Sequence, residues 1–266
     1  MLKNKRAGRI TPLWVAQNYL TGTKTIKRCI DRASLDKHDH VIEIGPGKGH
    51  ITRVLINKCR QVTAIEKDNN LYKKLKSKDY QSKGLQLFNA DFLKWSLPIS
   101  GSYKVFSNIP FCITTDIIRK LTECKNPPAE SWLIVEKGAA KRFLGIPKET
   151  LRSLMLKPMF DINIKYYFSR EDFHPKPGVD IVLLHLKRKE QPDIPVNQVK
   201  LYEKFISVCL KYGIHGLRRF FTKKQTYRVL KEAGINNFTP SETLYIQWLC
   251  LFRCYRAVGL NFYNER

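Results

Sequence analysis

The sequence lacks several features that would place it in a common class of protein. It contains no apolar run that approaches the roughly 20 residues needed to span a bilayer. Its basic N-terminus is not followed by the apolar segment of a secretory signal. Its seven cysteines form no Cys-x-x-Cys pair and have no histidine partners at zinc-site spacing. We therefore expect a reduced, cytoplasmic protein with buried thiols, no membrane span and no bound metal.

Acidic side chains are also scarce. The 266 residues include 23 Asp and Glu against 48 Lys and Arg, which gives a formal net charge of +25. A surface needed only for solubility is better served by charges of both signs, so this excess favours a phosphate-rich partner such as a nucleic acid. Because 43% of the residues are hydrophobic and 11% are aromatic, the chain can still bury a sizeable core.

Three successive apolar runs end in residues that suit a nucleotide-like ligand. Residues 41–44 lead directly into Gly45 and Gly47, and the next two runs end at Glu66 and Asp91. Glycines allow a backbone to approach a ligand closely, and an acid about 20 residues after a glycine turn is typical of a ribose-binding carboxylate. The pattern predicts a βαβ unit whose strand ends form a binding site.

Two other interpretations compete with a site for S-adenosylmethionine. A dinucleotide fold has the same outline but favours Gly-x-Gly-x-x-Gly, whereas Gly45, Gly47 and Gly49 are spaced as Gly-x-Gly-x-Gly. Asp91 alone would more often cap a turn or a helix. Together with the glycines and Glu66, however, it is better explained by an S-adenosylmethionine pocket, in which a carboxylate accepts a hydrogen bond from the adenine amino group.

A fourth apolar run, residues 103–106, ends in a stiff turn that carries an amide and an aromatic ring. The Asn108 side-chain oxygen and the Ile109 carbonyl can accept hydrogen bonds from an adenine amino group, which localises its lone pair and stabilises the charge that develops during methyl transfer. Pro110 has a fixed φ, and Phe111 can stack on the base. The turn predicts methylation of an adenine that is flipped out of a duplex or lies in an RNA loop.

Cys112 follows this turn and suggests an alternative, a pyrimidine-C5 methyltransferase with a thiolate nucleophile. That chemistry requires a covalent attack, which an Asn-Pro-aromatic turn does not favour, so we expect a spectator thiol. A purely structural turn is the other alternative, and the pocket predicted upstream argues against it.

The order of the elements indicates an α/β protein with a Rossmann-like, mixed and mostly parallel seven-stranded sheet. Its last two strands are expected near 162–168 and 179–187. A proline-bearing linker follows, and the pattern beyond it is helical. We expect a catalytic domain at 1–187 and a small α-helical domain at 188–266. A monomer is expected because no exposed heptad pattern is present.

At these residues the chain resembles a known family, the erythromycin-resistance rRNA adenine-N6 methyltransferases (Erm family) of the rRNA adenine dimethylase superfamily. Family-like stretches occur in order over most of the chain. They are QNYLT at 17–21, EIGPGKGHIT at 43–52, TAIEKD at 63–68, NAD at 89–91, FSNIPFCITTDIIRK at 106–120, LIVEKGAAKRF at 133–143, FHPKP at 173–177 and FTKKQ at 221–225.

The resemblance implies a Rossmann-like S-adenosylmethionine-dependent enzyme and assigns roles to particular residues. Asn108 and Phe111 would handle the target base. Most relatives carry Tyr at position 111, where this chain has Phe. A Phe ring can still stack on the base, whereas any role of a phenol hydroxyl is lost. The residues that would line the cofactor site are Asn18, Leu20, Gly45, Gly47, Glu66, Asp91 and Asn108.

The substrate implied by the resemblance is one adenine in a single-stranded loop of 23S rRNA, whose mono- or dimethylation blocks macrolides, lincosamides and streptogramin B. The nearest alternative is the sibling enzyme that dimethylates two adenines of small-subunit rRNA. That group typically has Leu where Lys48 and Ile109 stand here. An alternative from another class is a non-catalytic RNA- or DNA-binding factor on the same fold, although the intact glycine turn and Asn108 argue against it.

Overall fold

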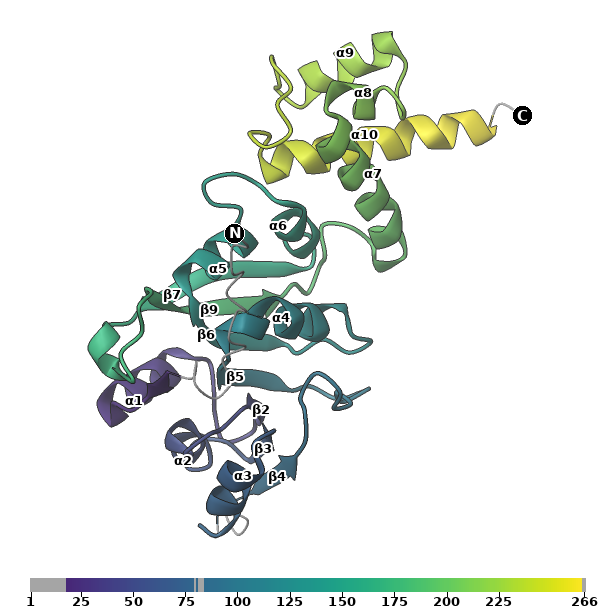
Figure 1. Ribbon diagram of the computed structural model, residues 1–266. Helices are drawn as coiled ribbons and strands as arrows, with labels where there is room; N and C mark the ends of the chain where they lie inside the picture. Colours follow the sequence, from purple (N-terminus) through teal and green to yellow (C-terminus); the bar gives the residue numbers. More distant parts are fainter. Residues whose placement is uncertain (1–17, 79, 81–83, 265–266) are drawn as a thin grey trace, which may run out of the picture. The chain divides into compact units, whose positions relative to one another are not determined.

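Strands and helices alternate through most of the chain, as Figure 1 shows for the computed structural model. The structure describes residues 18–78, 80 and 84–264; Gln17 of the first family-like stretch lies outside them. The strands are β1 (Tyr19–Leu20), β2 (His40–Ile44), β3 (Gln61–Glu66), β4 (Leu85–Asn89), β5 (Lys104–Asn108), β6 (Glu130–Glu136), β7 (Phe160–Tyr167), β8 (Phe173–His174) and β9 (Ile181–Arg188). The α-helices are α1 (Thr23–Arg32), α2 (His50–Leu55), α3 (Asn69–Lys76), α4 (Thr114–Glu123), α5 (Lys137–Leu144), α6 (Leu151–Leu156), α7 (Val199–Tyr212), α8 (Ile214–Leu217), α9 (Lys223–Glu232) and α10 (Tyr245–Asn264).

Seven strands form one sheet in the order β4-β3-β2-β5-β6-β9-β7. The pairs β2–β3, β3–β4, β2–β5 and β5–β6 are parallel. From β2 the chain first adds β3 and β4 on one side and then returns to add β5 and β6 on the other. The order of strands therefore reverses between β2 and β5, and ligands of such sheets bind at the carboxyl ends of the strands beside that point.

The last two strands of this sheet run antiparallel to each other. The N–H of Phe168 donates to the carbonyl of Ile181 (3.0 Å), and at the other end the N–H of Lys189 donates to the carbonyl of Met159 (2.9 Å). The sheet is therefore mixed, and the prediction of a Rossmann-like α/β fold with a seven-stranded sheet is confirmed.

The central strands are buried on both faces, as expected for a parallel sheet flanked by helices. In β6, Ser131 to Val135 are all buried, and in β2 the same holds from Val41 to Ile44. Side chains alternate along a strand, and those on one face join the apolar side chains of α1 and α2 in a single cluster that includes Ile30, Leu55 and Phe106. This buried sheet is the framework that holds the strand ends in place.

A second, two-stranded sheet consists of β1 and β8. Tyr19 pairs with His174 and Leu20 with Phe173 in antiparallel register. The 3-10 turn that precedes β8 (Arg170–Asp172) adds two bonds to the start of α1: the N–H of Thr21 donates to the Asp172 carbonyl (3.0 Å), and the Thr25 hydroxyl donates to Asp172 Oδ1 (2.8 Å). These contacts fix the backbone just after Asn18.

The C-terminal helices have an aromatic core of their own. Phe205 of α7 contacts the rings of Phe220, Phe252 and Tyr255, and Trp248 of α10 is fully buried. This cluster also includes buried aliphatic side chains of α6 and α9. The helical segments thus bury apolar residues against one another, which explains their 3.6-residue pattern in the sequence.

Contacts divide the chain into two compact units, Met1–Lys137 with Ile164–His185 and Gly138–Asn163 with Leu186–Arg266. The second unit takes in residues 138–163 because Leu154 of α6 packs into the core of the C-terminal helices. This division does not test whether separate domains meet between residues 187 and 188, so that boundary stays a prediction. Among the described helices, none combines the length and apolarity needed to cross a membrane.

Candidate active site

A glycine turn leaves the carboxyl end of β2. Gly45 and Gly47 have φ of +63° and +56°, a region that other residues rarely adopt. A Cβ on Gly47 would lie 2.7 Å from the Tyr19 ring, whereas a Cβ on Gly45 would meet nothing within 4 Å. Gly47 therefore allows the turn to pack under Tyr19, while Gly45 leaves open space for a ligand.

Glu66, at the end of β3, is held by two backbone donors. Its Oε2 accepts the N–H of Gly47 (2.9 Å), and its Oε1 accepts the N–H of Asp68 (2.8 Å). The side chain is only 2% exposed. Burial raises the pKa of this carboxyl, and the two backbone bonds act in the opposite direction. The two backbone bonds fix the position of the side chain. Because each oxygen keeps a further lone pair, the carboxylate can still accept a hydrogen bond from a ligand hydroxyl.

Asp91, just after β4, both caps a turn and faces a cavity. Its Oδ1 accepts the N–H of Leu93 (3.0 Å), and its Oδ2 forms an ion pair with Lys67 (2.9 Å). The hydrogen bond from Lys67 is the main reason why the pKa of Asp91 is lowered. Asp91 is thus ionised at neutral pH. Asp91 therefore caps a turn and also lines the cavity, so the cap does not exclude the predicted role in a site.

The ends of β2, β3 and β4 enclose a cavity of about 450 Å³. This lies within the usual range of about 300–1,000 Å³ for small-molecule sites. Apolar side chains from Ile65, Phe92 and Ile113 contribute to its wall alongside Glu66 and Asp91. The cavity therefore combines apolar side chains, one of them an aromatic ring, with two carboxylates, a combination that suits a ligand with a planar base and a diol.

Asn108 ends β5, next to β2 across the point where the strand order reverses. Its Nδ2 donates to the carbonyl of Asn18 (2.8 Å), and this bond fixes which end of the amide faces that carbonyl. Its Oδ1 is buried and has no hydrogen-bond partner among the described residues. Buried acceptors are normally satisfied. This oxygen is therefore an acceptor that the described part of the fold leaves for a ligand.

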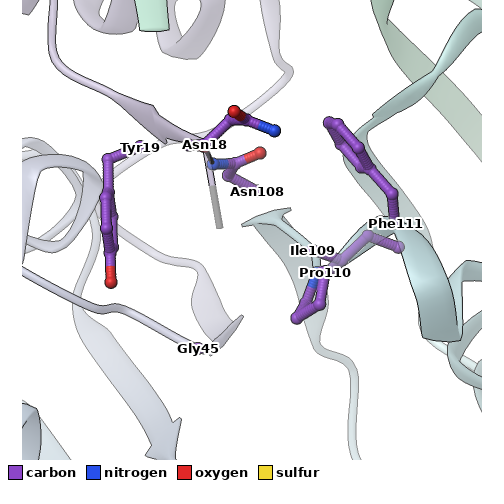
Figure 2. A pocket seen from close by; sticks show the side chains of 7 residues that line it. All are labelled: Asn18, Tyr19, Gly45, Asn108, Ile109, Pro110 and Phe111. Carbon is purple, nitrogen blue, oxygen red and sulfur yellow. Dashed lines mark hydrogen bonds between the residues drawn. The ribbon is translucent and has the colours of Figure 1, made fainter. Parts of the chain in front are cut away.

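A smaller cavity surrounds this oxygen. Figure 2 shows the Asn108 oxygen pointing toward the side on which the Phe111 ring lies, with Pro110 below and Tyr19 farther along the wall. Gly45 and Pro110 line this cavity and also the larger one. The two cavities are therefore neighbours, so that a group held in one can meet a group held in the other.

The predicted site residues fall into two sets. Gly45, Glu66 and Asp91 line the larger cavity, and Asn18, Gly45, Asn108 and Phe111 line the smaller one. Gly47 lines neither and acts through the bond that its N–H donates to Glu66. Leu20 is 2% exposed and belongs to the hydrophobic core. The roles of these residues toward ligands stay predictions.

Sequence reasoning missed other residues of the walls, notably Tyr19, Lys67 and Ile113. Tyr19 and Lys67 are direct neighbours of predicted residues, so adjacency was the only available signal. Ile113 lies in the 3-10 turn (Phe111–Ile113) that follows Pro110. Its apolar character does not distinguish it from a core residue.

The sheet order and the cavities at the strand ends are those of a Rossmann-like methyltransferase fold. Residues 15–250 match the family model for ribosomal RNA adenine dimethylase. The chain belongs to this family and is an enzyme, an rRNA adenine-N6 methyltransferase.

Its relatives and structural neighbours agree with this assignment. The chain is 38% identical to the rRNA adenine N-6-methyltransferase of Limosilactobacillus reuteri over 91% of its own length and 95% of that protein. It is 36% identical to the protein of the same name from Staphylococcus aureus over 90% of its length and 95% of that protein. The crystal structure of the 23S rRNA methyltransferase ErmE superposes with a TM-score of 0.82 at 27% identity, covering 90% of this chain and 100% of that one.

Proposed function

We propose that the chain methylates N6 of one adenine in a single-stranded loop of 23S rRNA, with S-adenosylmethionine as the methyl donor, and thereby confers resistance to macrolides, lincosamides and streptogramin B. The observation that carries the proposal is the buried Oδ1 of Asn108, which has no hydrogen-bond partner within residues 18–78, 80 and 84–264 and lies beside Phe111, next to the larger cavity. The large-subunit substrate is supported by the likeness to ErmE, which is a 23S rRNA methyltransferase. We place the enzyme in the cytoplasm, as a monomer.

The larger cavity fits S-adenosylmethionine. The open space over Gly45, the fixed carboxylate of Glu66 and the ionised Asp91 match a ligand that carries a diol and an adenine amino group. When bound, the cofactor supplies a methyl group that its sulfonium charge already activates. Glu66 would accept hydrogen bonds from the diol, and Asp91 would accept from the adenine amino group.

The residues around the smaller cavity would hold the amino edge of the target adenine, because the cavity itself, at about 20 Å³, is too small for the whole base. Asn108 Oδ1 and the carbonyl of Ile109 would accept the two hydrogens of its amino group, so that the nitrogen lone pair is no longer spread into the ring. The ring of Phe111 would stack on the base, a contact worth about 1–3 kcal/mol. Pro110 keeps the turn stiff. Orientation of the nitrogen toward the neighbouring cavity supplies the rest of the rate acceleration.

Exposed basic side chains are available for the RNA backbone. Lys141 and Arg142 of α5 and Lys223 and Lys224 of α9 are exposed. Other basic side chains already have protein partners: Lys137 is paired with Asp180, Lys176 with Glu171, and Arg219 lies over the Tyr212 ring. Since phosphate contacts release counterions, affinity for RNA should fall steeply as salt is raised.

The test uses tritiated S-adenosylmethionine with separated, protein-free 23S and 16S rRNA, for the wild type and Asn108→Ala. Primer extension then locates the modified base, because a dimethylated adenine cannot pair and stops the polymerase. We expect label in 23S rRNA with one stop, lost in the variant. Label at two neighbouring adenines of 16S rRNA would instead identify the small-subunit enzyme. Tight RNA binding without label would indicate a binding factor.

A further inference from the structure

Three potential metal ligands meet where α9 approaches α10. Glu232 is the last residue of α9, and Cys250 and Cys254 lie one turn apart on α10. Their ligand atoms, one carboxylate oxygen and two sulfurs, all lie within 4.8 Å of one another. Within the described residues, these three side chains are close enough together to share one metal ion. It lies in the second unit, far along the chain from every residue of the candidate active site.

The surroundings hold these ligands in place. Residues at i and i+4 project from the same face of a helix, and Gln247 precedes Cys250 on that face. The Gln247 amide donates to the carbonyls of Ala233 (3.3 Å) and Gly234 (3.4 Å), directly after Glu232. The end of α9 is thus tied to the first turns of α10. Both sulfurs are half-buried and Glu232 is exposed, so the group is reachable from solvent on the carboxylate side.

The spacing suits a metal better than a disulfide. Two sulfurs bound to a tetrahedral zinc ion at about 2.3 Å lie about 3.8 Å apart, which a small rotation of these side chains can reach. A disulfide requires Cβ atoms about 3.5–4.5 Å apart, whereas i and i+4 positions of a helix hold them at about 5–6 Å. Because α10 continues unbroken through both cysteines, oxidation would have to distort it.

Charge does not oppose a cation here, because binding of the ion with release of two thiol protons leaves the local charge at −1. Glu232 stands at the C-terminal end of α9, where the helix dipole disfavours a carboxylate and favours positive charge. A complex of one divalent ion with two thiolates and one carboxylate has a net charge of −1, which is acceptable in a chain with a net charge of +25. Soft thiolates select zinc-like ions over magnesium or calcium.

We propose that Glu232, Cys250 and Cys254 form a binding site for a thiophilic divalent cation, with Zn²⁺ as the physiological candidate. Binding forms two metal–sulfur bonds and one metal–oxygen bond and releases the two thiol protons to solvent, while water fills the fourth position. The ion would clamp the end of α9 to α10 and stabilise the C-terminal helices. The site is independent of the methyl-transfer proposal.

The test titrates the reduced, chelator-free, full-length protein with Co²⁺ and then displaces it with Zn²⁺. We expect one equivalent of Co²⁺ with a thiolate-to-cobalt charge-transfer band, which Zn²⁺ abolishes. Cys250→Ser and Cys254→Ser should each remove most of this band. Glu232→Gln should keep the band and weaken Zn²⁺ binding about tenfold or more, measured by competition with a chromophoric chelator. Cys124→Ser, which removes a half-buried thiol at the end of α4, is the matched control and should change nothing.

A second readout does not depend on the band. Zn²⁺ at about 100 times its Kd should raise Tm of the wild type and of Cys124→Ser by about 5–10 °C, and should leave Tm of Cys254→Ser unchanged. Circular dichroism verifies that each variant is folded. No charge-transfer band in the wild type would overturn the proposal. So would a band that persists in both serine variants, or a Zn²⁺ affinity that Glu232→Gln leaves unaltered.

Discussion

The two cavities differ in how their hydrogen-bond acceptors are satisfied. In the larger one, both oxygens of Glu66 accept backbone N–H groups, and Asp91 is held by Leu93 and Lys67. In the smaller one, Asn108 Oδ1 is buried without a partner among the described residues. We infer that the fold holds the cofactor-facing carboxylates with its own donors, and that the substrate-facing acceptor is completed only when the base arrives.

A fourth acceptor, the carboxyl of Glu43, sharpens this comparison. Glu43 of β2 is 2% exposed, and its Oε2 also has no partner in the described part of the chain, yet Glu43 lines neither cavity. Burial raises the pKa of this carboxyl to about 8, with the neighbouring charge of Glu66 adding to the effect and Thr52 opposing it. Glu43, which lines neither cavity, thus keeps a proton on its buried carboxyl at neutral pH. The amide of Asn108 cannot respond in this way, because it does not titrate.

The largest effect is expected from removing Asn108 Oδ1, the acceptor for which the described part of the chain supplies no donor. Asn108→Ala should lower kcat by about 10²–10³-fold, or about 3–4 kcal/mol, because the developing charge on the adenine nitrogen loses an acceptor placed for it. Cofactor affinity, measured by calorimetry, should change far less. Asn126→Ala is the matched control, because it removes an amide that bonds only loop carbonyls away from both cavities. A loss of cofactor affinity equal to the loss of kcat would contradict the assignment.

The next effect concerns stability and tests Glu43. In the unfolded chain the carboxyl ionises near its ordinary pKa of 4.5, while in the folded chain it stays protonated up to about pH 8. The folded state therefore binds the extra proton in this interval, and stability falls as the pH rises through it. Between about pH 5 and pH 7 the loss from this group should be about 2–3 kcal/mol.

Glu43→Gln should remove this part of the pH dependence, because the amide cannot ionise. Urea unfolding of both proteins across the interval measures the difference, and other titrating groups cancel between them. The variant should gain relative to the wild type with each step to higher pH. Parallel stability profiles would mean that Glu43 is ionised in the folded protein.

A smaller effect is expected where the fold already supplies the donors. Glu66→Gln should weaken cofactor binding about tenfold, since the amide nitrogen faces one of the backbone N–H groups of Gly47 and Asp68 and a charge-assisted bond to the ligand is lost. Asp31 offers the matched control. Asp31→Asn removes a carboxylate that is paired with Lys58 and lines neither cavity, and should leave affinity within about threefold. Equal losses in both variants would remove the special role of Glu66.

The strand ends show what could be predicted from the sequence. Gly45, Glu66, Asp91 and Asn108 were found because each follows an apolar run, and parallel strands bring such ends to one edge. The pairing of β1 with β8 could not be predicted, because each strand has only two residues and the paired residues Leu20 and Phe173 are 153 positions apart in the sequence. The orientation of the Asn108 amide could not be predicted either, because its Nδ2 donates to the backbone carbonyl of Asn18, which carries no side-chain signal. That bond turns Oδ1 to a place where the described residues offer it no donor.

The Glu232, Cys250 and Cys254 group shows the same limit in the second unit. The two thiols are visible in the sequence as a pair one helical turn apart, which is typical of ordinary core packing. The third ligand comes from another helix, and only the packing of α9 on α10 brings it close. Local patterns predict which residues end a strand or share a helix face, and they do not predict partners from a different element.

An effect similar in size to that of Glu66→Gln should come from Phe111, and it separates the two parts of the smaller cavity. Phe111→Leu keeps apolar volume and loses the aromatic face, so KM for RNA should rise by an amount equivalent to about 1–3 kcal/mol. Phe111→Tyr keeps the face, and because residue 111 is only half-buried, the added hydroxyl can stay hydrated. Both kcat and KM of this variant should therefore stay within about threefold of the wild type. A Tyr variant that is much faster would mean that the hydroxyl takes part in the reaction, and that Asn108 is not the sole side-chain acceptor for the adenine amino group.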